Sequence, residues 1–162
     1  PHEIPGHWVY KLEPKTGKVE VIHKYLAMPN GIVFSPDESR IYIADTGGHK
    51  RHPDPDFHKL PASIQCYEID NKGNLGKKLF QIASGSDGMA VDAQGNLYAT
   101  HGCKVHIYDA DGNERQQIDV PEGPANVCFG GDDHKTLFIT ARTSLYSVRM
   151  RVAGAKLKGA SK

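Results

Sequence analysis

The stretch Asp87-Gly88-Met89-Ala90-Val91, followed after a short turn by Leu97-Tyr98-Ala99-Thr100, is one of three copies of the same pattern in this chain. Each copy is an apolar segment of strand length, a polar turn and a second apolar segment. The other two copies are Asn30-Gly31-Ile32-Val33-Phe34 with Ile41-Tyr42-Ile43-Ala44-Asp45, and Ala125-Asn126-Val127-Cys128-Phe129 with Leu137-Phe138-Ile139-Thr140. A hairpin that recurs at a spacing of roughly 40–60 residues is typical of a β-propeller, in which blades surround a central axis.

The rest of the chain has the same character, with short apolar segments separated by turns that contain Pro, Gly, Asp or Asn. No segment shows the apolar period of a helix. We therefore predict an all-β fold, a six-bladed β-propeller of which this chain supplies about three to three and a half C-terminal blades. The expected strands are 8–12, 19–22, 32–34, 41–44, 64–69, 89–91, 97–100, 105–108, 127–129, 137–140 and 145–148.

Residues 1–152 are expected to form the partial propeller, and residues 153–162 a flexible C-terminal tail. Such a partial ring cannot close, because apolar sheet faces and strand edges would stay exposed. The missing blades could belong to another polypeptide, to a second copy of this chain, or to a longer protein that contains it. We favour the last arrangement, so the N-terminal half of the propeller, in the same protein or as a separate chain, is an expected partner.

The composition argues against two classes of partner. The chain of 162 residues has 20 basic and 19 acidic side chains, a formal charge of +1, and neither sign is clustered. No apolar run approaches the roughly 18–20 residues that span a bilayer. Neither nucleic acid nor a membrane is therefore an expected partner. The three cysteines, Cys66, Cys103 and Cys128, lie in or beside apolar segments and are predicted to be buried free thiols.

One insertion, residues 45–63, interrupts the repeat and is rich in Gly, His, Pro and Asp. Because it joins an inner strand to the next outer one, it should lie over one mouth of the ring. Its histidines, His49, His52 and His58, could hold zinc, but their spacing matches no recognised metal motif. A polar loop that forms the rim of an active site is the favoured interpretation.

Two polar side chains, Asn30 and Asp87, begin equivalent strands and are each followed by glycine. Either they only stabilise turns, as Asn and Asp often do, or they point into the central channel. Carboxylate and amide oxygens that converge on one axis would suit Ca²⁺ or Mg²⁺. In the third copy Ala125 occupies this position, and Asn126 is a weaker candidate.

Other chemical motifs are missing from the sequence. Asp109-Ala110-Asp111-Gly112-Asn113 resembles the start of an EF-hand loop, but Val120 stands where a bidentate Glu is required, so we predict a hairpin turn. There is no G-x-S-x-G, H-E-x-x-H or phosphate-binding glycine motif. These absences leave two possibilities, a hydrolase that uses a metal ion or a protein without catalytic activity.

Four segments resemble the SMP-30 family, which includes gluconolactonase, regucalcin and luciferin-regenerating enzyme. They are M-P-N-G-I-V-F-S-P-D (28–37), Y-I-A-D-T-G (42–47), S-D-G-M-A-V-D (86–92) and F-G-G-D (129–132). The resemblance implies a six-bladed propeller with one divalent cation, Ca²⁺ foremost and Zn²⁺ or Mg²⁺ as alternatives. It implies that Asn30 is a metal ligand and that Asp87 is both a ligand and the general base. The family's glutamate ligand near its N-terminus has no counterpart here.

The resemblance implies a metal-dependent sugar lactone hydrolase, with a small-molecule lactone as substrate. The cation would polarise the lactone carbonyl, and Asp87 would activate water. Asn126, His49 and His101 are further candidates for contacting the substrate. The alternatives are a non-catalytic propeller that serves as a binding scaffold, and a related propeller esterase or phosphoesterase.

Overall fold

The structure, a computed structural model, describes residues 4–50 and 52–156. Over these residues it contains thirteen β-strands and one short 3₁₀ helix, η1 (Pro55–Phe57), and the strands form four antiparallel sheets. The all-β prediction is confirmed. By sheet, the strands are β1 (Val9–Glu13) and β2 (Lys18–His23); β3 (Pro29–Phe34), β4 (Arg40–Asp45), β5 (Ser63–Ile69) and β6 (Leu75–Ile82); β7 (Met89–Val91), β8 (Leu97–His101), β9 (Lys104–Tyr108) and β10 (Glu114–Asp119); and β11 (Pro124–Gly130), β12 (Thr136–Ala141) and β13 (Leu145–Arg149).

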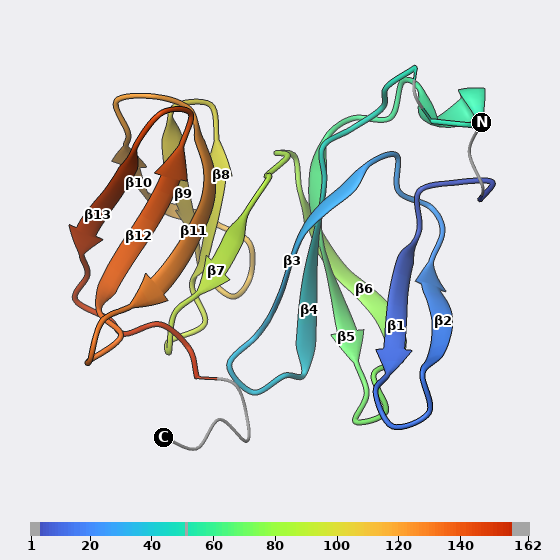
Figure 1. The fold of residues 1–162 in the computed structure, drawn as a ribbon, viewed down its shortest axis with the longest axis horizontal. Helices are drawn as coiled ribbons and strands as arrows, with labels where there is room; N and C mark the ends of the chain where they lie inside the picture. The colour runs from blue at the N-terminus through green and yellow to red at the C-terminus, as the bar shows by residue number, and fades with distance from the viewer. Residues whose placement is uncertain (1–3, 51, 157–162) are drawn as a thin grey trace.

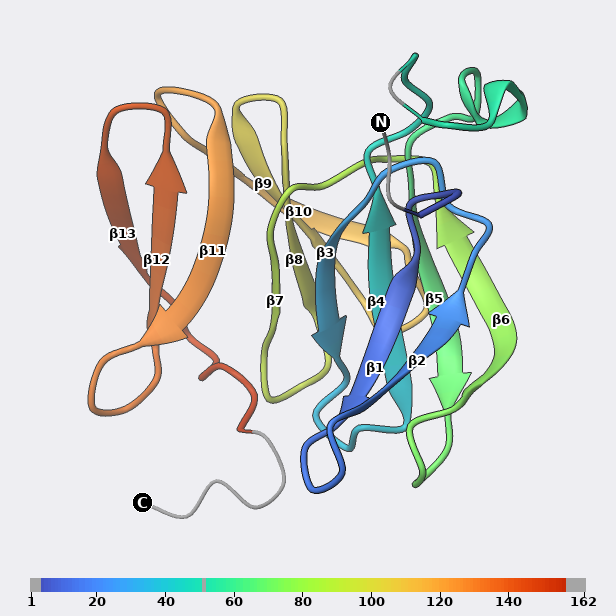
Figure 2. The same cartoon turned by 45° about the vertical axis from the view of Figure 1, so that its right-hand side comes forward.

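The sheets follow one another in chain order, as the blades of a propeller do. Figure 1 shows the β1–β2 hairpin at one end of the molecule and the β11–β13 sheet at the other, and in Figure 2 the hairpin lies in front of the β3–β6 sheet. The first strands of the three larger sheets meet at the inside of this arrangement, since β3 contacts β7 and β7 contacts β11. The residues just before or within these first strands are therefore brought together.

Two outer strands, β6 and β10, were not predicted from the sequence. The residues of β10, E-R-Q-Q-I-D, are almost all exposed, and β6 is only partly buried. An outermost strand has one open edge, and the apolar residues of β6 that pack on the core, Leu79, Phe80 and Ile82, form neither a long apolar run nor a clean alternation. The hairpin turns before these two strands were correctly located.

The core lies between the blades. On β4, Tyr42 and Ala44 pack toward the β7–β10 sheet, whereas Ile41 and Ile43 pack toward the β1–β2 hairpin. Both faces of this sheet are thus buried, which explains why β4 has an unbroken apolar sequence. Full burial of an isoleucine or leucine side chain contributes roughly 1.5–3 kcal/mol, so these paired faces hold neighbouring blades together. A further cluster around Leu137 joins the β7–β10 and β11–β13 sheets.

The three hairpin turns with the sequence D-x-x-G-N are built in the same way. In each, the Asp carboxylate accepts hydrogen bonds from the main-chain N–H groups two and four residues later and from the Asn side chain. The glycine has a positive φ, for example +85° at Gly112, a conformation that favours glycine. The turn that begins at Asp109 thus uses its carboxylate within its own backbone, as predicted for a hairpin turn.

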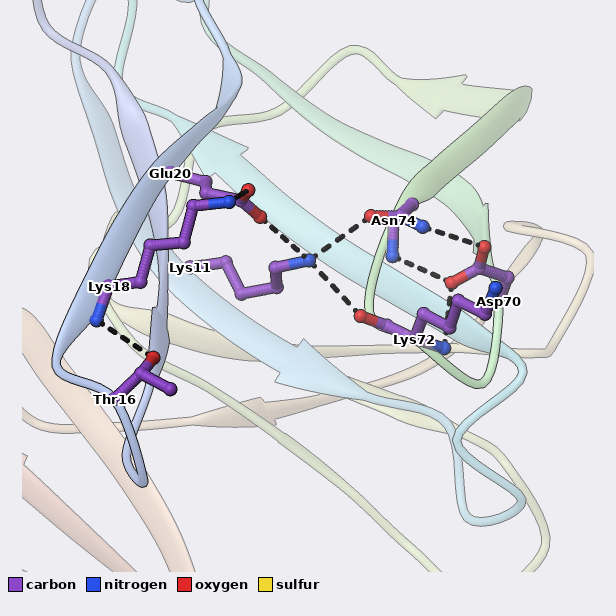
Figure 3. Close-up of polar contacts among 7 residues, drawn as sticks. All are labelled: Lys11, Thr16, Lys18, Glu20, Asp70, Lys72 and Asn74. Atoms are coloured by element: carbon purple, nitrogen blue, oxygen red, sulfur yellow. Dashed lines mark hydrogen bonds and ion pairs between the residues drawn. The ribbon is translucent and has the colours of Figure 1, made fainter.

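The β1–β2 hairpin is attached to the neighbouring sheet by a lysine (Figure 3). The ammonium group of Lys11 donates hydrogen bonds of 3.1 Å to the main-chain oxygen of Lys72 and to the side chain of Asn74, and it lies 3.2 Å from the carboxylate of Glu20. The turn that receives it is fixed by the carboxylate of Asp70. The hairpin therefore occupies the place of the outer half of a preceding blade.

Two expectations differ from the structure. Part of the predicted tail is ordered against the last two blades, because Ala155 N–H donates to Val91 O at 2.9 Å and Gly154 forms a β-bridge with Asp92. Residues 157–162 lie outside the described residues. Of the three cysteines, which are free thiols, only Cys66 is buried. The prediction of burial was wrong for Cys103, which lies in the β8–β9 turn, and for Cys128, which is exposed on β11.

None of the helical segments in residues 4–50 and 52–156 has the length and apolar character needed to cross a membrane.

Candidate active site

A β-bulge places Asn30 at the inner edge of its blade. Between the pairs Pro29↔Asp45 and Ile32↔Ile43, strand β3 contributes two residues, Asn30 and Gly31, against one on β4. Such a bulge bends the strand and redirects a side chain, and bulges are common beside active sites. The third blade has a similar irregularity at Ala125, between Pro124↔Ala141 and Asn126↔Thr140.

The side chains of Asn30 and Asp87 meet across two blades. The amide nitrogen of Asn30 donates a hydrogen bond of 2.9 Å to the carboxylate of Asp87, and both side chains are exposed. Asn30 is in β3 and Asp87 lies two residues before β7, so the contact joins the innermost strands of adjacent blades. The structure thus places these two predicted site residues in direct contact.

The glycine after each of these residues permits the close approach. A Cβ atom on Gly31 would lie 2.9 Å from the main-chain oxygen of Asp87. A Cβ atom on Gly88 would overlap with the side chain and Cα of Asn126. The glycines of the N-G and D-G motifs are therefore needed because the inner strands touch through their backbones.

Hydroxyl groups fix the backbone on either side of Asp87. Ser86 Oγ donates to the main-chain oxygen of Gly88 at 2.9 Å, and Gly88 N–H donates to Thr100 Oγ1 at 3.2 Å. Thr100 Oγ1 also lies 3.3 Å from the main-chain oxygen of Ala125 in the third blade. Ser86 and Thr100 are buried, so Asp87 is exposed on a rigid turn. The sequence analysis did not identify either hydroxyl, since a Ser or Thr at a strand end has no distinctive pattern.

The carboxylate of Asp45 fixes the backbone near Asn30. It is buried and accepts hydrogen bonds of 2.8 Å from the N–H groups of Ala27 and Met28, and one of 3.0 Å from Gly47. These bonds hold the segment that leads to Asn30. The sequence does not indicate this positioning role, because an Asp at the end of a strand is a common turn residue.

A cavity of about 370 Å³ opens beside Asp87. Its walls come from all three larger blades. They include the two ends of the insertion, Thr46 and Ala62, the end of β8 with His101, and the β12–β13 turn with Arg142. His101 was a predicted substrate contact, and it does line this cavity. Arg142 was missed, because a single arginine in a polar turn cannot be distinguished from a solvent-exposed one by its sequence.

The other two predicted substrate contacts lie differently. The described residues that line the cavity do not include His49 or Asn126. The side-chain oxygen of Asn126 accepts a hydrogen bond of 2.8 Å from the N–H of Val127, and the residue is exposed at the inner edge of β11. Asn126 thus lies against Gly88 rather than beside the cavity.

His52 and His58 of the insertion contact other residues of the insertion, and His52 also contacts His7. The buried His52 ring stacks on Phe57 at 4.3 Å between centroids and meets His7 edge to face at 4.8 Å. His58 Nε2 lies 2.9 Å from the main-chain oxygen of His52. Within residues 4–50 and 52–156, no three His, Cys, Asp or Glu side chains are grouped to hold a metal ion.

Asn30 and Asp87 fit a divalent cation only in part. One amide oxygen and one carboxylate are hard donors of the kind that Ca²⁺ and Mg²⁺ accept. Rotation of the Asn30 amide would exchange its nitrogen and oxygen and turn the oxygen toward the same place. Ca²⁺ takes about six to eight oxygen ligands, so two side chains are too few and further oxygen ligands would be needed.

Adjacent antiparallel sheets with polar side chains at their inner edge define the class of this fold as part of a β-propeller. The chain belongs to the SMP-30/Gluconolactonase/LRE-like family, whose sequence model matches residues 2–143. The prediction of this family is confirmed.

Named relatives support the family and the fold. The chain is 30% identical to the gluconolactonase of Zymomonas mobilis over 94% of its own length and 43% of that protein. It superimposes on a gluconolactonase from Xanthomonas campestris with a TM-score of 0.73 and 27% identity, covering 91% of this chain and 46% of the other. Regucalcin from Agrobacterium tumefaciens, a calcium-binding protein, matches with a TM-score of 0.69 at 22% identity, covering 95% of this chain and 56% of the other; this likeness shows the fold alone.

The chain spans about half the length of these proteins. The predicted propeller, of which this chain is a part, is confirmed by its likeness to them.

Proposed function

We propose that the protein formed by this chain and the remaining blades hydrolyses a sugar lactone to the corresponding aldonic acid. The observation that carries the proposal is the contact of Asn30 with Asp87 at the inner edge of adjacent blades, beside a cavity. Relatives of the chain named gluconolactonase support the reaction class. The remaining blades lie on an N-terminal segment of the same protein or on a separate chain.

Asp87 acts as the general base. Its carboxylate takes a proton from the water whose oxygen forms a bond to the lactone carbonyl carbon. When the bond between this carbon and the ring oxygen breaks, the carboxylic acid returns the proton to the ring oxygen. The hydrogen bonds of Ser86 and Thr100 hold the turn and so keep Asp87 at one position relative to the cavity.

Asn30 and Asp87 would hold a divalent cation, with Ca²⁺ as the first choice and Zn²⁺ or Mg²⁺ as alternatives. When bound, the cation would supply Lewis-acid polarisation of the carbonyl and stabilise the negative charge that develops on its oxygen. The neutral amide of Asn30 leaves more net positive charge at the site than a second carboxylate would. We propose further that His101, from the cavity wall, Asn126, from the inner edge of β11, and His49, from the insertion, contact substrate hydroxyls.

One observation favours a second function, a non-catalytic propeller that serves as a binding scaffold. The direct hydrogen bond between Asn30 and Asp87 satisfies both groups without a cation. In this case the pair would be structural, and the cavity would bind a ligand without chemistry. A propeller esterase or phosphoesterase would use Asn30 and Asp87 to hydrolyse an ester or phosphoester bond instead of a lactone.

Hydrolysis assays on the intact protein separate these functions. Acid release is followed with glucono-1,5-lactone, an aryl ester and an aryl phosphate, with Ca²⁺ and after chelation. We expect turnover of the lactone, loss of turnover in Asp87→Ala and no change in Asp111→Asn, a matched carboxylate change on an outer turn. Hydrolysis of only the ester or the phosphate would indicate a propeller esterase or phosphoesterase. Absence of turnover with all three compounds would favour the non-catalytic binding scaffold.

A further inference from the structure

The cavity beside Asp87 also has a cationic wall. Arg142, in the turn between β12 and β13, lines it from the third blade, and His101 lines it from the second. The mechanism above assigns no part to Arg142. The inference that follows concerns the substrate class of this site and rests on the proposed function.

Arg142 is exposed and, unlike Arg115 and Arg149, has no ion-pair partner among the described residues. Arg115 and Arg149 form ion pairs with Asp109 and Asp133. In the described part of the chain, no carboxylate lies within ion-pair distance of the Arg142 guanidinium, and no hydrogen bond of this group is found there. A guanidinium that lines a cavity without a counter-charge is suited to bind an anion that enters it.

The turn that carries Arg142 is nevertheless held in place. The carboxylate of Glu122 accepts hydrogen bonds from Thr143 N–H at 3.2 Å, from Thr143 Oγ1 at 3.0 Å and from the hydroxyl of Tyr146 at 3.2 Å. Glu122 precedes Gly123, and a Cβ atom there would lie 3.5 Å from Arg142 Nε. The Arg142 guanidinium thus lies beside the Gly123 backbone at the cavity edge, next to a turn that Glu122 holds in place.

Arg142 and Asp87 reach the cavity from different blades. Asp87 lies before β7 and Arg142 after β12, and both line the same cavity. A volume of about 370 Å³ is within the range of small-molecule sites. A sugar lactone could therefore place its carbonyl near Asp87 and a substituent from the far end of its carbon chain near Arg142.

We propose that Arg142 is a specificity-determining residue that binds an anionic oxygen group, such as phosphate, sulfonate or carboxylate, on the end of the substrate remote from the lactone carbonyl. The planar guanidinium forms two parallel hydrogen bonds with such groups, which a neutral hydroxymethyl group cannot match. The site therefore prefers an acidic lactone to its neutral counterpart. His101 lies on the same wall and contributes a hydrogen bond to a neighbouring hydroxyl.

The test compares two lactones on the intact protein, glucono-1,5-lactone and its 6-phosphate. We expect a higher kcat/KM for the phosphorylated lactone. Arg142→Gln should lower kcat/KM for this substrate about 10–100-fold, mainly through KM, and change the neutral lactone less than twofold. Arg142→Lys should retain an intermediate preference for the phosphorylated lactone, because lysine keeps the positive charge but cannot form the two parallel hydrogen bonds of the guanidinium. Arg149→Gln, whose partner is Asp133, is the matched control.

A binding measurement decides the inference separately from the reaction. Titration calorimetry with glucose 6-phosphate and with glucose should show tighter binding of the phosphate, lost in Arg142→Gln. If neither lactone is hydrolysed, the proposed function fails, but loss of phosphate binding in Arg142→Gln still supports the anion site. If Arg142→Gln affects both lactones equally, or binds glucose 6-phosphate as wild type does, the inference is overturned while lactone hydrolysis stands.

Discussion

The amide of Asn30 and the carboxylate of Asp87 are joined by a hydrogen bond of 2.9 Å although 57 residues separate them in the chain. The contact exists because both residues begin the innermost strand of a blade. The glycines that follow them let those strands touch. Two motifs that look like simple turns in the sequence therefore form one site in the folded chain.

A cation at this pair should stabilise the intact protein. We expect Ca²⁺ at about 100 times its dissociation constant to add about 2.7 kcal/mol to the free energy of unfolding, seen as a higher melting temperature. Asn30→Ala and Asp87→Asn should each reduce this shift, because each removes one donor. Asp111→Asn should keep it. An equal shift in all four proteins would show that the cation binds elsewhere.

The close contact of β7 with β11 should be sensitive to one methyl group. In Gly88→Ala, the new Cβ would overlap with Asn126, so the inner strands must move apart. We expect a loss of about 2–4 kcal/mol in the free energy of unfolding, measured by urea denaturation. Gly123→Ala is the control, since its Cβ would have only ordinary contacts at 3.5 Å. Equal stability of the two variants would contradict the inter-blade contact.

The buried carboxylate of Asp92 should be a major stabilising group. It accepts hydrogen bonds from two N–H groups of its turn, from the Asn96 side chain, and from the buried hydroxyl of Tyr98 at 3.1 Å. Burial, followed by the charge of Asp92, raises the pKa of Tyr98, so the hydroxyl stays protonated and donates.

Replacement of Asp92 by Ala leaves these donors without an acceptor and should cost about 3 kcal/mol in the free energy of unfolding. Tyr98→Phe removes only one donor and should cost about 1 kcal/mol. Urea denaturation of both variants provides the measurement. A larger loss for Tyr98→Phe than for Asp92→Ala would contradict the stabilising role of the carboxylate, because the Tyr98 hydroxyl is only one of its donors.

The outer turn at Asp109 should contribute to stability in a defined range of pH. Hydrogen bonds, first of all from the main-chain N–H of Asn113, lower the pKa of Asp109 to about 2 from its ordinary value of 3.8. Because the folded-state pKa is lower than the unfolded one, the contribution is complete above about pH 4 and is lost as the pH falls toward 2.

We therefore expect Asp109→Asn to show a weaker decrease of melting temperature between pH 4 and 2 than wild type. Asp111→Asn, on the same turn, changes a carboxylate that does not accept the hydrogen bonds of this turn, and its profile should follow wild type. Thermal denaturation monitored by circular dichroism across this range checks both. Identical slopes for Asp109→Asn and wild type would show that the turn is not coupled to acid unfolding.

Some features could not be predicted because they depend on groups that are far apart in the chain. Nothing local marks β6 or β10 as strands, because β10 is largely exposed and the apolar residues of β6 that pack on the core do not alternate regularly with polar ones. The roles of Ser86 and Thr100 depend on backbone atoms of other segments. Arg142 is an ordinary turn residue until the third blade brings it to the cavity.

The sequence by itself determined the all-β fold, the repeat of the blades and the choice of Asn30 and Asp87. These follow from local physics, because alternation of apolar segments with Gly, Pro, Asp and Asn turns leaves few other folds, and the N-G and D-G pairs recur at one position in the repeat. Only the tertiary structure decided that the two side chains touch, that Asn126 and His49 lie outside the cavity, and that Arg142 lines it. Distances between blades are set by packing of their faces, which no short stretch of sequence encodes.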